Sequence, residues 1–128
     1  MAAVIRKMWT AAETNKHQDH VIAHVIGATP LSHFVHDETA YILLDIGFIW
    51  NIYLNLEMGL VPQRLAISEL DVDAESLQIT NVECGPIESV EVFEDGEERR
   101  LVLNCEQGAL MVETSLSHRW IRVHPWLE

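Results

Sequence analysis

Basic residues are scarce in this chain of 128 residues. It contains 8 Lys and Arg against 20 Asp and Glu, which gives a formal net charge of −12 at pH 7. Residues 65–128 alone hold 14 acidic and 4 basic residues, and no Lys or Arg lies between Glu69 and Glu98. Such a surface repels a phosphate backbone, so we expect no nucleic-acid partner. An acidic exterior is typical of soluble proteins, and it favours a basic protein as a partner.

Cysteine is also rare, and the chain has only Cys84 and Cys105. Neither belongs to a C-x-x-C pair, and two thiols in a chain of this size do not make a disulfide scaffold. We expect ordinary reduced thiols, but a bridge between them stays open because they flank a predicted hairpin. The acidic neighbour Glu83 argues against Cys84 as a catalytic nucleophile.

The sequence lacks a recognisable leader and a membrane span. Residues 1–9 contain no apolar run followed by a small-residue cleavage site. Ala40–Leu56 is strongly apolar, but it is shorter than the ~20 residues that a spanning helix needs, and it carries Asp45. Its β-branched and aromatic residues instead predict two strands joined by a tight turn at Asp45–Gly47. We therefore expect a cytoplasmic protein without membrane contact.

Sequence motifs that hold nucleotides or a catalytic serine are absent. The chain contains no G-x-x-x-x-G-K-[ST], G-x-G-x-x-G or G-x-S-x-G pattern. Nucleotide cradles and nucleophile elbows are therefore disfavoured. We expect no cofactor.

The chain does have enough apolar material for one core. Hydrophobic residues make up 48% of it and are spread along its length, so residues 1–128 should form one domain. Thr10–Glu13 has the form of a capping box and predicts the start of a helix. This helix either continues to a cap at Gly27, or ends near His17 before a strand at Val21–Ile26, which the β-branched residues favour. Two short middle helices are predicted at Pro62–Leu70 and Asp73–Leu77.

Strands are predicted from alternating apolar and polar residues and from β-branched and aromatic content. In the segment Phe48–Asn55, the side chains of Phe48, Trp50, Ile52 and Leu54 share one face and should form the centre of the core. The other predicted strands are Leu31–His36, Tyr41–Leu44, Leu110–Thr114 and His118–Trp126.

The clearest local signal is a hairpin within Ser89–Asn104. Asp95–Gly96 suits a two-residue type I′ turn, which would place Glu91 opposite Arg100. Together the signals predict an α+β fold, in which one N-terminal helix and short middle helices lie on about six or seven antiparallel strands. These strands would form a twisted sheet or a partly closed barrel.

Histidines supply the main candidate for chemistry. On a helix, His17, His20 and His24 would share a face and could hold a transition metal. On a strand, His20 and His24 would lie about 13 Å apart, too far to bind one ion. A second polar cluster, predicted at a hairpin tip, contains His33, His36, Asp37 and Glu38. We interpret that cluster as a solvated turn, or as further ligands if folding brings it near the first.

Three other features bear on function. Asp45 should cap its turn, because an unpaired buried carboxylate is costly. The C-terminal segment alternates aromatic and basic character at Trp120, Arg122, His124 and Trp126, and it either binds a partner or docks on the acidic hairpin of its own chain or of a second copy. A small-molecule pocket lined by Tyr41, Trp50 and Tyr53 is a further hypothesis.

Our leading functional prediction is a non-catalytic interaction protein that binds another protein or forms a homodimer. The alternative is a metal-dependent enzyme that uses His17, His20 and His24. A bound ion at near one per chain would favour the enzyme, and salt-sensitive association would favour the interaction protein.

Overall fold

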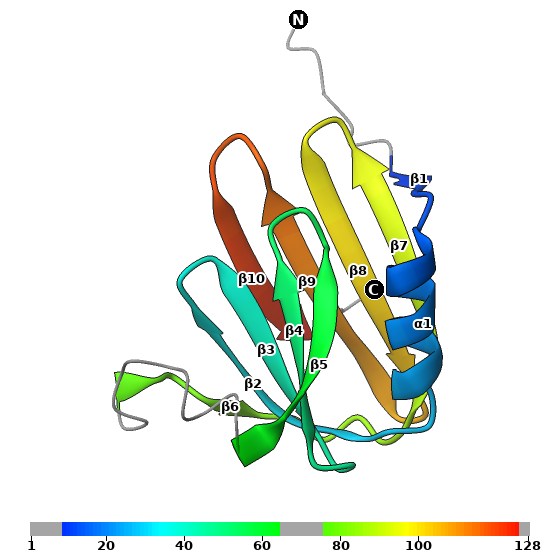
Figure 1. Cartoon of the computed structure of the whole chain (residues 1–128), viewed down its shortest axis with the longest axis vertical. Helices are drawn as coiled ribbons and strands as arrows, with labels where there is room; N and C mark the ends of the chain where they lie inside the picture. Colours follow the sequence, from blue (N-terminus) through cyan, green and yellow to red (C-terminus); the bar gives the residue numbers. More distant parts are fainter. Residues whose placement is uncertain (1–8, 65–75, 126–128) are drawn as a thin grey trace, which may run out of the picture.

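Strands dominate the computed structural model, which describes residues 9–64 and 76–125. The described residues form ten strands, joined in antiparallel pairs into two five-stranded sheets, and one α-helix, α1 (Lys16–Val25; Figure 1). Sheet I has the order β1 (Thr10–Ala11), β7 (Ile87–Asp95), β8 (Glu98–Cys105), β9 (Gly108–Ser115) and β10 (Trp120–Pro125). Sheet II has the order β5 (Met58–Pro62), β4 (Phe48–Tyr53), β3 (Thr39–Leu44), β2 (Pro30–His36) and β6 (Thr80–Asn81).

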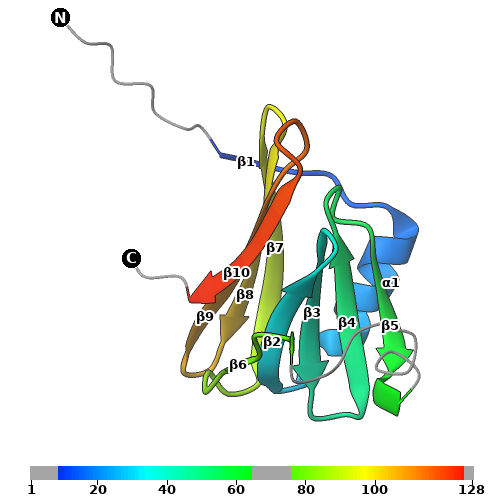
Figure 2. The ribbon, with the colours of Figure 1, turned by 90° about the vertical axis from the view of Figure 1, so that its left-hand side faces the viewer.

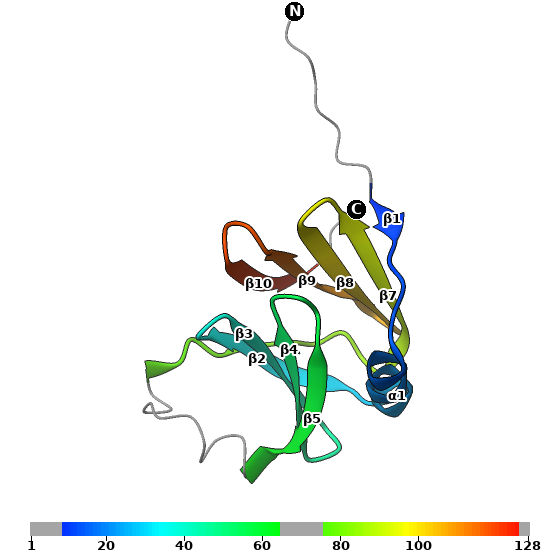
Figure 3. The ribbon, with the colours of Figure 1, turned by 45° about the horizontal axis from the view of Figure 1, so that its top comes forward.

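The two sheets face each other and enclose the hydrophobic core (Figure 2). They diverge on the side of β5 and β7, where α1 fills the opening (Figure 3). Val21 and Val25 of α1 are buried in the same core as residues from both sheets. The largest fully buried side chains that the sheets contribute to this core are Trp50, Ile42, Leu44, Ile52, Ile87, Leu101, Leu103 and Leu110.

Helix α1 begins at a capping box that the sequence analysis did not select. The Asn15 side chain accepts a hydrogen bond from the backbone N–H of Gln18, and the Gln18 side chain accepts one from the N–H of Asn15. Thr10 instead belongs to β1 and pairs with Glu94 of β7, so the predicted box at Thr10–Glu13 is wrong.

The helix continues to Val25 and is followed by Gly27 at a φ of +89°. The helical alternative for this segment is therefore confirmed, and the favoured strand at Val21–Ile26 is wrong. Packing decides the outcome, since a helix places Val21 and Val25 on one buried face and outweighs the strand preference of β-branched residues.

Sheet II confirms the strands predicted in the apolar stretch. Ala40–Leu56 contains β3 and β4, and no helix among the described residues is both long and apolar enough to cross a membrane. Trp50 and Ile52 are fully buried, as predicted, but Phe48 at the start of β4 is 37% exposed. Ile49 is fully buried on the opposite face, so the burial of β4 does not alternate as expected.

The β7–β8 hairpin forms, but with a different register. Asp95 pairs with Glu98, so Gly96 and Glu97 are the central residues of the turn. Gly96 has a φ of +60°, which suits the first central position of a type II′ turn. Arg100 consequently lies opposite Phe93 rather than Glu91, and the predicted type I′ turn at Asp95–Gly96 is wrong.

The predicted fold class also needs correction. Among the described residues the fold is mostly β with a single α-helix, and it has two separate sheets rather than a partly closed barrel. The predicted helices at Pro62–Leu70 and Asp73–Leu77 fall largely outside the described residues, and Pro62 itself ends β5. Pro62 could take this place because a strand end at a sheet edge tolerates the missing N–H.

Candidate functional site

A groove between α1 and sheet II brings together all three histidines of the predicted metal cluster. Its volume is about 370 Å³. One wall is the helix and the other is formed by the β3–β4 turn, β4 and β5. The lining residues are His17, His20, Val21, His24, Ile46, Phe48 and Leu60. We call this feature the histidine groove.

Two of its imidazoles have one ring nitrogen committed to a backbone carbonyl. Nε2 of His17 lies 2.8 Å from the carbonyl oxygen of Met58, and Nδ1 of His24 lies 2.9 Å from that of His20. A carbonyl oxygen can only accept, so these two nitrogens carry the protons. When the rings are neutral, Nδ1 of His17 and Nε2 of His24 are therefore hydrogen-bond acceptors.

The opposite wall of the groove is apolar and open to solvent. Ile46 in the β3–β4 turn is 46% exposed and Phe48 is 37% exposed, although both are large hydrophobic side chains. The incomplete burial of Phe48 thus has a structural consequence, because it places an aromatic ring beside the helix histidines.

The three histidines do not form a three-ligand metal centre. No group of three or more His, Cys, Asp or Glu residues is placed to hold one ion in the part of the chain that the structure describes. The ring centroids of His20 and His24 lie 4.4 Å apart, whereas His17 is tied to Met58. A metal-dependent reaction at these residues stays a prediction that no observation here tests.

The second predicted polar cluster lies elsewhere. His33 lines another cavity, while Asp37 and Glu38 form the β2–β3 turn, where both have positive φ. Glu38 accepts two hydrogen bonds from the guanidinium of Arg119, at 3.0 and 2.6 Å, and thereby links this turn to the β9–β10 turn. Glu38 thus joins the two sheets.

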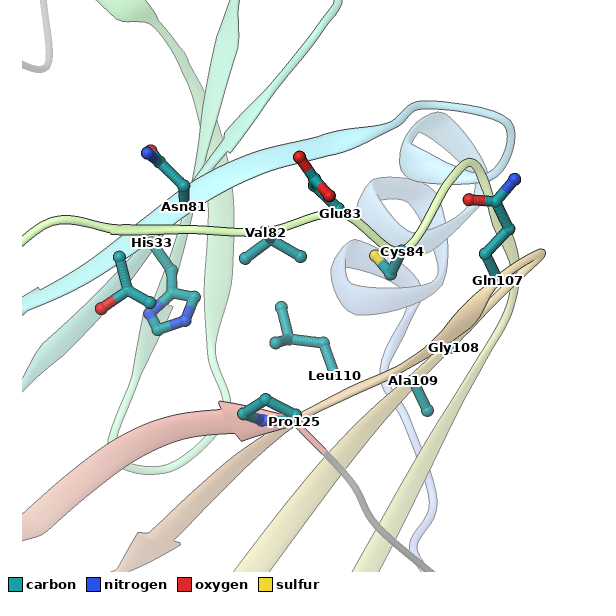
Figure 4. A pocket seen from close by; sticks show the side chains of 11 residues that line it. His33, Asn81, Val82, Glu83, Cys84, Gln107, Gly108, Ala109, Leu110 and Pro125 are labelled. Carbon is teal, nitrogen blue, oxygen red and sulfur yellow. The ribbon is translucent and has the colours of Figure 1, made fainter.

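The cavity at His33 has a volume of about 260 Å³ and lies where β2 and β6 approach the end of β10. Figure 4 shows His33 and Cys84 on opposite sides of Val82 within it. Burial lowers the pKa of His33, so its imidazole is neutral at neutral pH.

Cys84 contacts Cys105 with an Sγ–Sγ distance of 3.1 Å. From the sequence alone, a bridge between the two cysteines was possible, but their contact was not predicted.

Two residues of the predicted binding face on the C-terminal strand form ion pairs within the chain. Arg122 and His124 of β10 contact the carboxylate of Glu113 at 3.3 and 2.6 Å, and Arg100 of β8 contacts it at 3.2 Å. Trp120 lies under the Arg122 guanidinium at 4.9 Å. Strand β10 thus joins the sheet that contains the acidic hairpin.

The sequence analysis missed Glu113, the centre of this network. Trp126 lies outside the described residues. Whether the segment at Trp120, Arg122, His124 and Trp126 also binds a partner stays a prediction.

The remaining two predictions concern Asp45 and the pocket lined by Tyr41, Trp50 and Tyr53. Asp45 accepts a hydrogen bond from the N–H of Thr29 at 2.9 Å, so its carboxylate ties the β3–β4 turn to the segment before β2. Trp50 points into the core, whereas Tyr41 and Tyr53 lie on the other face of sheet II, so these three do not line one pocket.

Taken together, the described residues offer one apolar groove lined by histidines and one cavity that adjoins a pair of thiols. Neither holds an arrangement of nucleophile and base within hydrogen-bond distance. No protein-family model matches this chain, and neither a curated protein nor a solved structure matches it.

Proposed function

We propose that this chain is a non-catalytic binding protein whose histidine groove accepts a basic peptide segment of another protein. The observation that carries the proposal is the pairing of half-exposed Ile46 and Phe48 with imidazoles whose free nitrogens accept hydrogen bonds. Apolar surface of this kind, rimmed by polar groups, marks interaction sites on soluble proteins.

The groove sets two requirements on its occupant. An apolar side chain of the partner would cover Ile46 and Phe48, and burying such a side chain stabilises a complex by roughly 1.5 to 3 kcal/mol. Nδ1 of His17 and Nε2 of His24 would accept hydrogen bonds from Lys or Arg side chains or from backbone N–H groups.

Charge supports the same class of partner. The chain carries a formal net charge of −12, so its field attracts a cationic segment and repels an acidic one. Association should therefore weaken as salt is raised. A second copy of this acidic chain fits the groove less well than a basic segment does.

Selection from a displayed library of random peptides tests the proposal, with the full chain as bait. We expect the selected peptides to combine a large apolar residue with Lys or Arg. Ile46→Asp should weaken their binding at least tenfold, since it puts a carboxylate on the apolar wall. Ile79→Asp is the matched control, because Ile79 is 48% exposed and lies outside the groove.

Other outcomes would overturn the proposal. Selected peptides that are acidic, or that bind the Ile46→Asp and Ile79→Asp variants equally well, would exclude the histidine groove as the site. A self-associating chain whose dimer survives Ile46→Asp would instead favour the homodimer of our initial prediction.

A further inference from the structure

Cys84 and Cys105 lie together although 21 positions separate them in the sequence. Cys84 lies in the connection between β6 and β7, and Cys105 is the last residue of β8. Their side chains are 5% and 7% exposed, and their Sγ atoms are 3.1 Å apart.

Backbone hydrogen bonds hold the two cysteines in this position. The N–H of Gln107 donates to the carbonyl of Cys84 at 2.8 Å, and the N–H of Glu106 donates to the carbonyl of Pro86 at 3.0 Å. Gly85, at a φ of +75°, lets the connection turn closely past Glu106. The connection and the β8–β9 turn are therefore fixed side by side by contacts that do not involve the sulfur atoms.

We infer that Cys84 and Cys105 form a redox-modification site, in which a peroxide converts the two thiols into a disulfide bond. Two sulfur atoms in a disulfide are about 2.05 Å apart, so closure needs a sulfur movement of only about 1 Å. Side-chain rotation supplies a movement of this size without displacing the backbone.

The cavity decides which thiol reacts first. Cys84 lines the cavity of about 260 Å³, which is large enough to admit hydrogen peroxide, whereas Cys105 is not among the lining residues. Burial raises the pKa of Cys105 to about 12, with further contributions from Cys84 and Glu88. Cys105 is thus protonated at neutral pH and unreactive toward peroxide, because the thiolate is the nucleophile.

The reaction then has two steps. Cys84 gives up its thiol proton and its sulfur attacks one peroxide oxygen, the O–O bond breaks, and the displaced hydroxide takes up that proton, so the products are a sulfenic acid on Cys84 and one water. The Cys105 sulfur, already in contact with the Cys84 sulfur, next attacks it while the Cys105 proton transfers to the departing oxygen, so the S–O bond breaks and a second water leaves. The two thiols together lose two electrons, which reduce the peroxide.

Mass spectrometry of the intact, natively folded protein tests this inference. A slight excess of hydrogen peroxide should lower the mass by about 2 Da, and dithiothreitol should restore it. A peptide digest should contain one linked pair, Cys84 with Cys105. The oxidised protein should melt about 10 °C above the reduced one, since the bond restricts the unfolded chain across β7 and β8.

Two single variants distinguish this path from unspecific oxidation. Cys105→Ser should leave a sulfenic acid on Cys84 that dimedone traps, whereas Cys84→Ser should leave Cys105 as a thiol. A folded wild-type chain that keeps both thiols free in peroxide, or that forms only disulfides between chains, would overturn the inference. So would equal rates of oxidation in the two variants, and the wild-type mass decides the case if either variant does not fold.

Discussion

At the scale of single residues, Glu113 is a nearly buried carboxylate with three basic partners. Its side chain is 8% exposed and contacts Arg100, Arg122 and His124. Burial alone would raise its pKa, but hydrogen bonds from His124 and Arg100, with the charges of Arg122 and Arg100, outweigh burial and lower it. The carboxylate is therefore ionised at neutral pH and compensates cations on both neighbouring strands.

Replacing this carboxylate should destabilise the fold. We expect Glu113→Gln to lower the free energy of unfolding at pH 7 by about 1 to 3 kcal/mol, because Arg100 and Arg122 lose their counter-charge. Urea denaturation measures the difference, and Glu106→Gln is the control, since Glu106 is exposed. Equal losses in the two variants would contradict this account of Glu113.

The same variant has a defined pH dependence. A carboxylate whose pKa is lower in the folded state stabilises the fold above its unfolded pKa, about 4.3, and this contribution disappears as the pH falls through the folded pKa. The stability difference between wild type and Glu113→Gln should therefore be present at neutral pH and shrink below about pH 4.

Sequence reasoning missed Glu113 because its partners are not local. Within β9 it is one acidic residue among apolar ones. Only the register places Arg100 of β8 and Arg122 of β10 directly opposite it on either side. The wrong register predicted for the β7–β8 hairpin also hid this network, because it paired Arg100 with Glu91.

At the scale of elements, helix α1 depends on Gln18. This residue is 7% exposed, and its side chain accepts from the N–H of Asn15 and donates to the carbonyl of Leu56 at 2.9 Å. The cap therefore fixes both the start of the helix and its contact with the segment between β4 and β5.

Two capping patterns compete in the sequence, and mutation separates them. Asn15→Ala should lower the free energy of unfolding by about 1 kcal/mol, because the N–H of Gln18 loses its acceptor. Glu13→Ala, in the predicted box, should change it by less than about 0.5 kcal/mol. Thermal or urea unfolding checks both values, and the reverse order would place the helix start at Thr10.

Most elements could be predicted from the sequence because their signals are local. Alternation identified β4 and β10, apolar and β-branched or aromatic content identified β2, β3 and β9, and the glycine turn identified the β7–β8 hairpin. Which of the two segments, Thr10–Glu13 or Asn15–Gln18, caps the helix could not be predicted from local sequence. The answer depends on the pairing of β1 with β7 and on the hydrogen bond from Gln18 to Leu56. Helix or strand for Val21–Ile26 was likewise decided by packing against both sheets.

At the scale of the whole molecule, the separation into two sheets creates the candidate sites. Helix α1 fills the open side between β5 and β7, so its histidines face Ile46 and Phe48. The sequence predicted the three histidines as a group, because spacings of three and four residues share a helix face. It could not predict the apolar wall opposite them, since that wall comes from the β3–β4 turn, β4 and β5.

The most direct test of the groove as the binding site is amide hydrogen exchange of the full chain, with and without a saturating selected peptide. We predict that added protection is confined to α1, the β3–β4 turn and the adjoining parts of β4 and β5. Protection along β10 at Trp120–His124, with none at α1, would contradict the proposal and assign binding to the C-terminal strand.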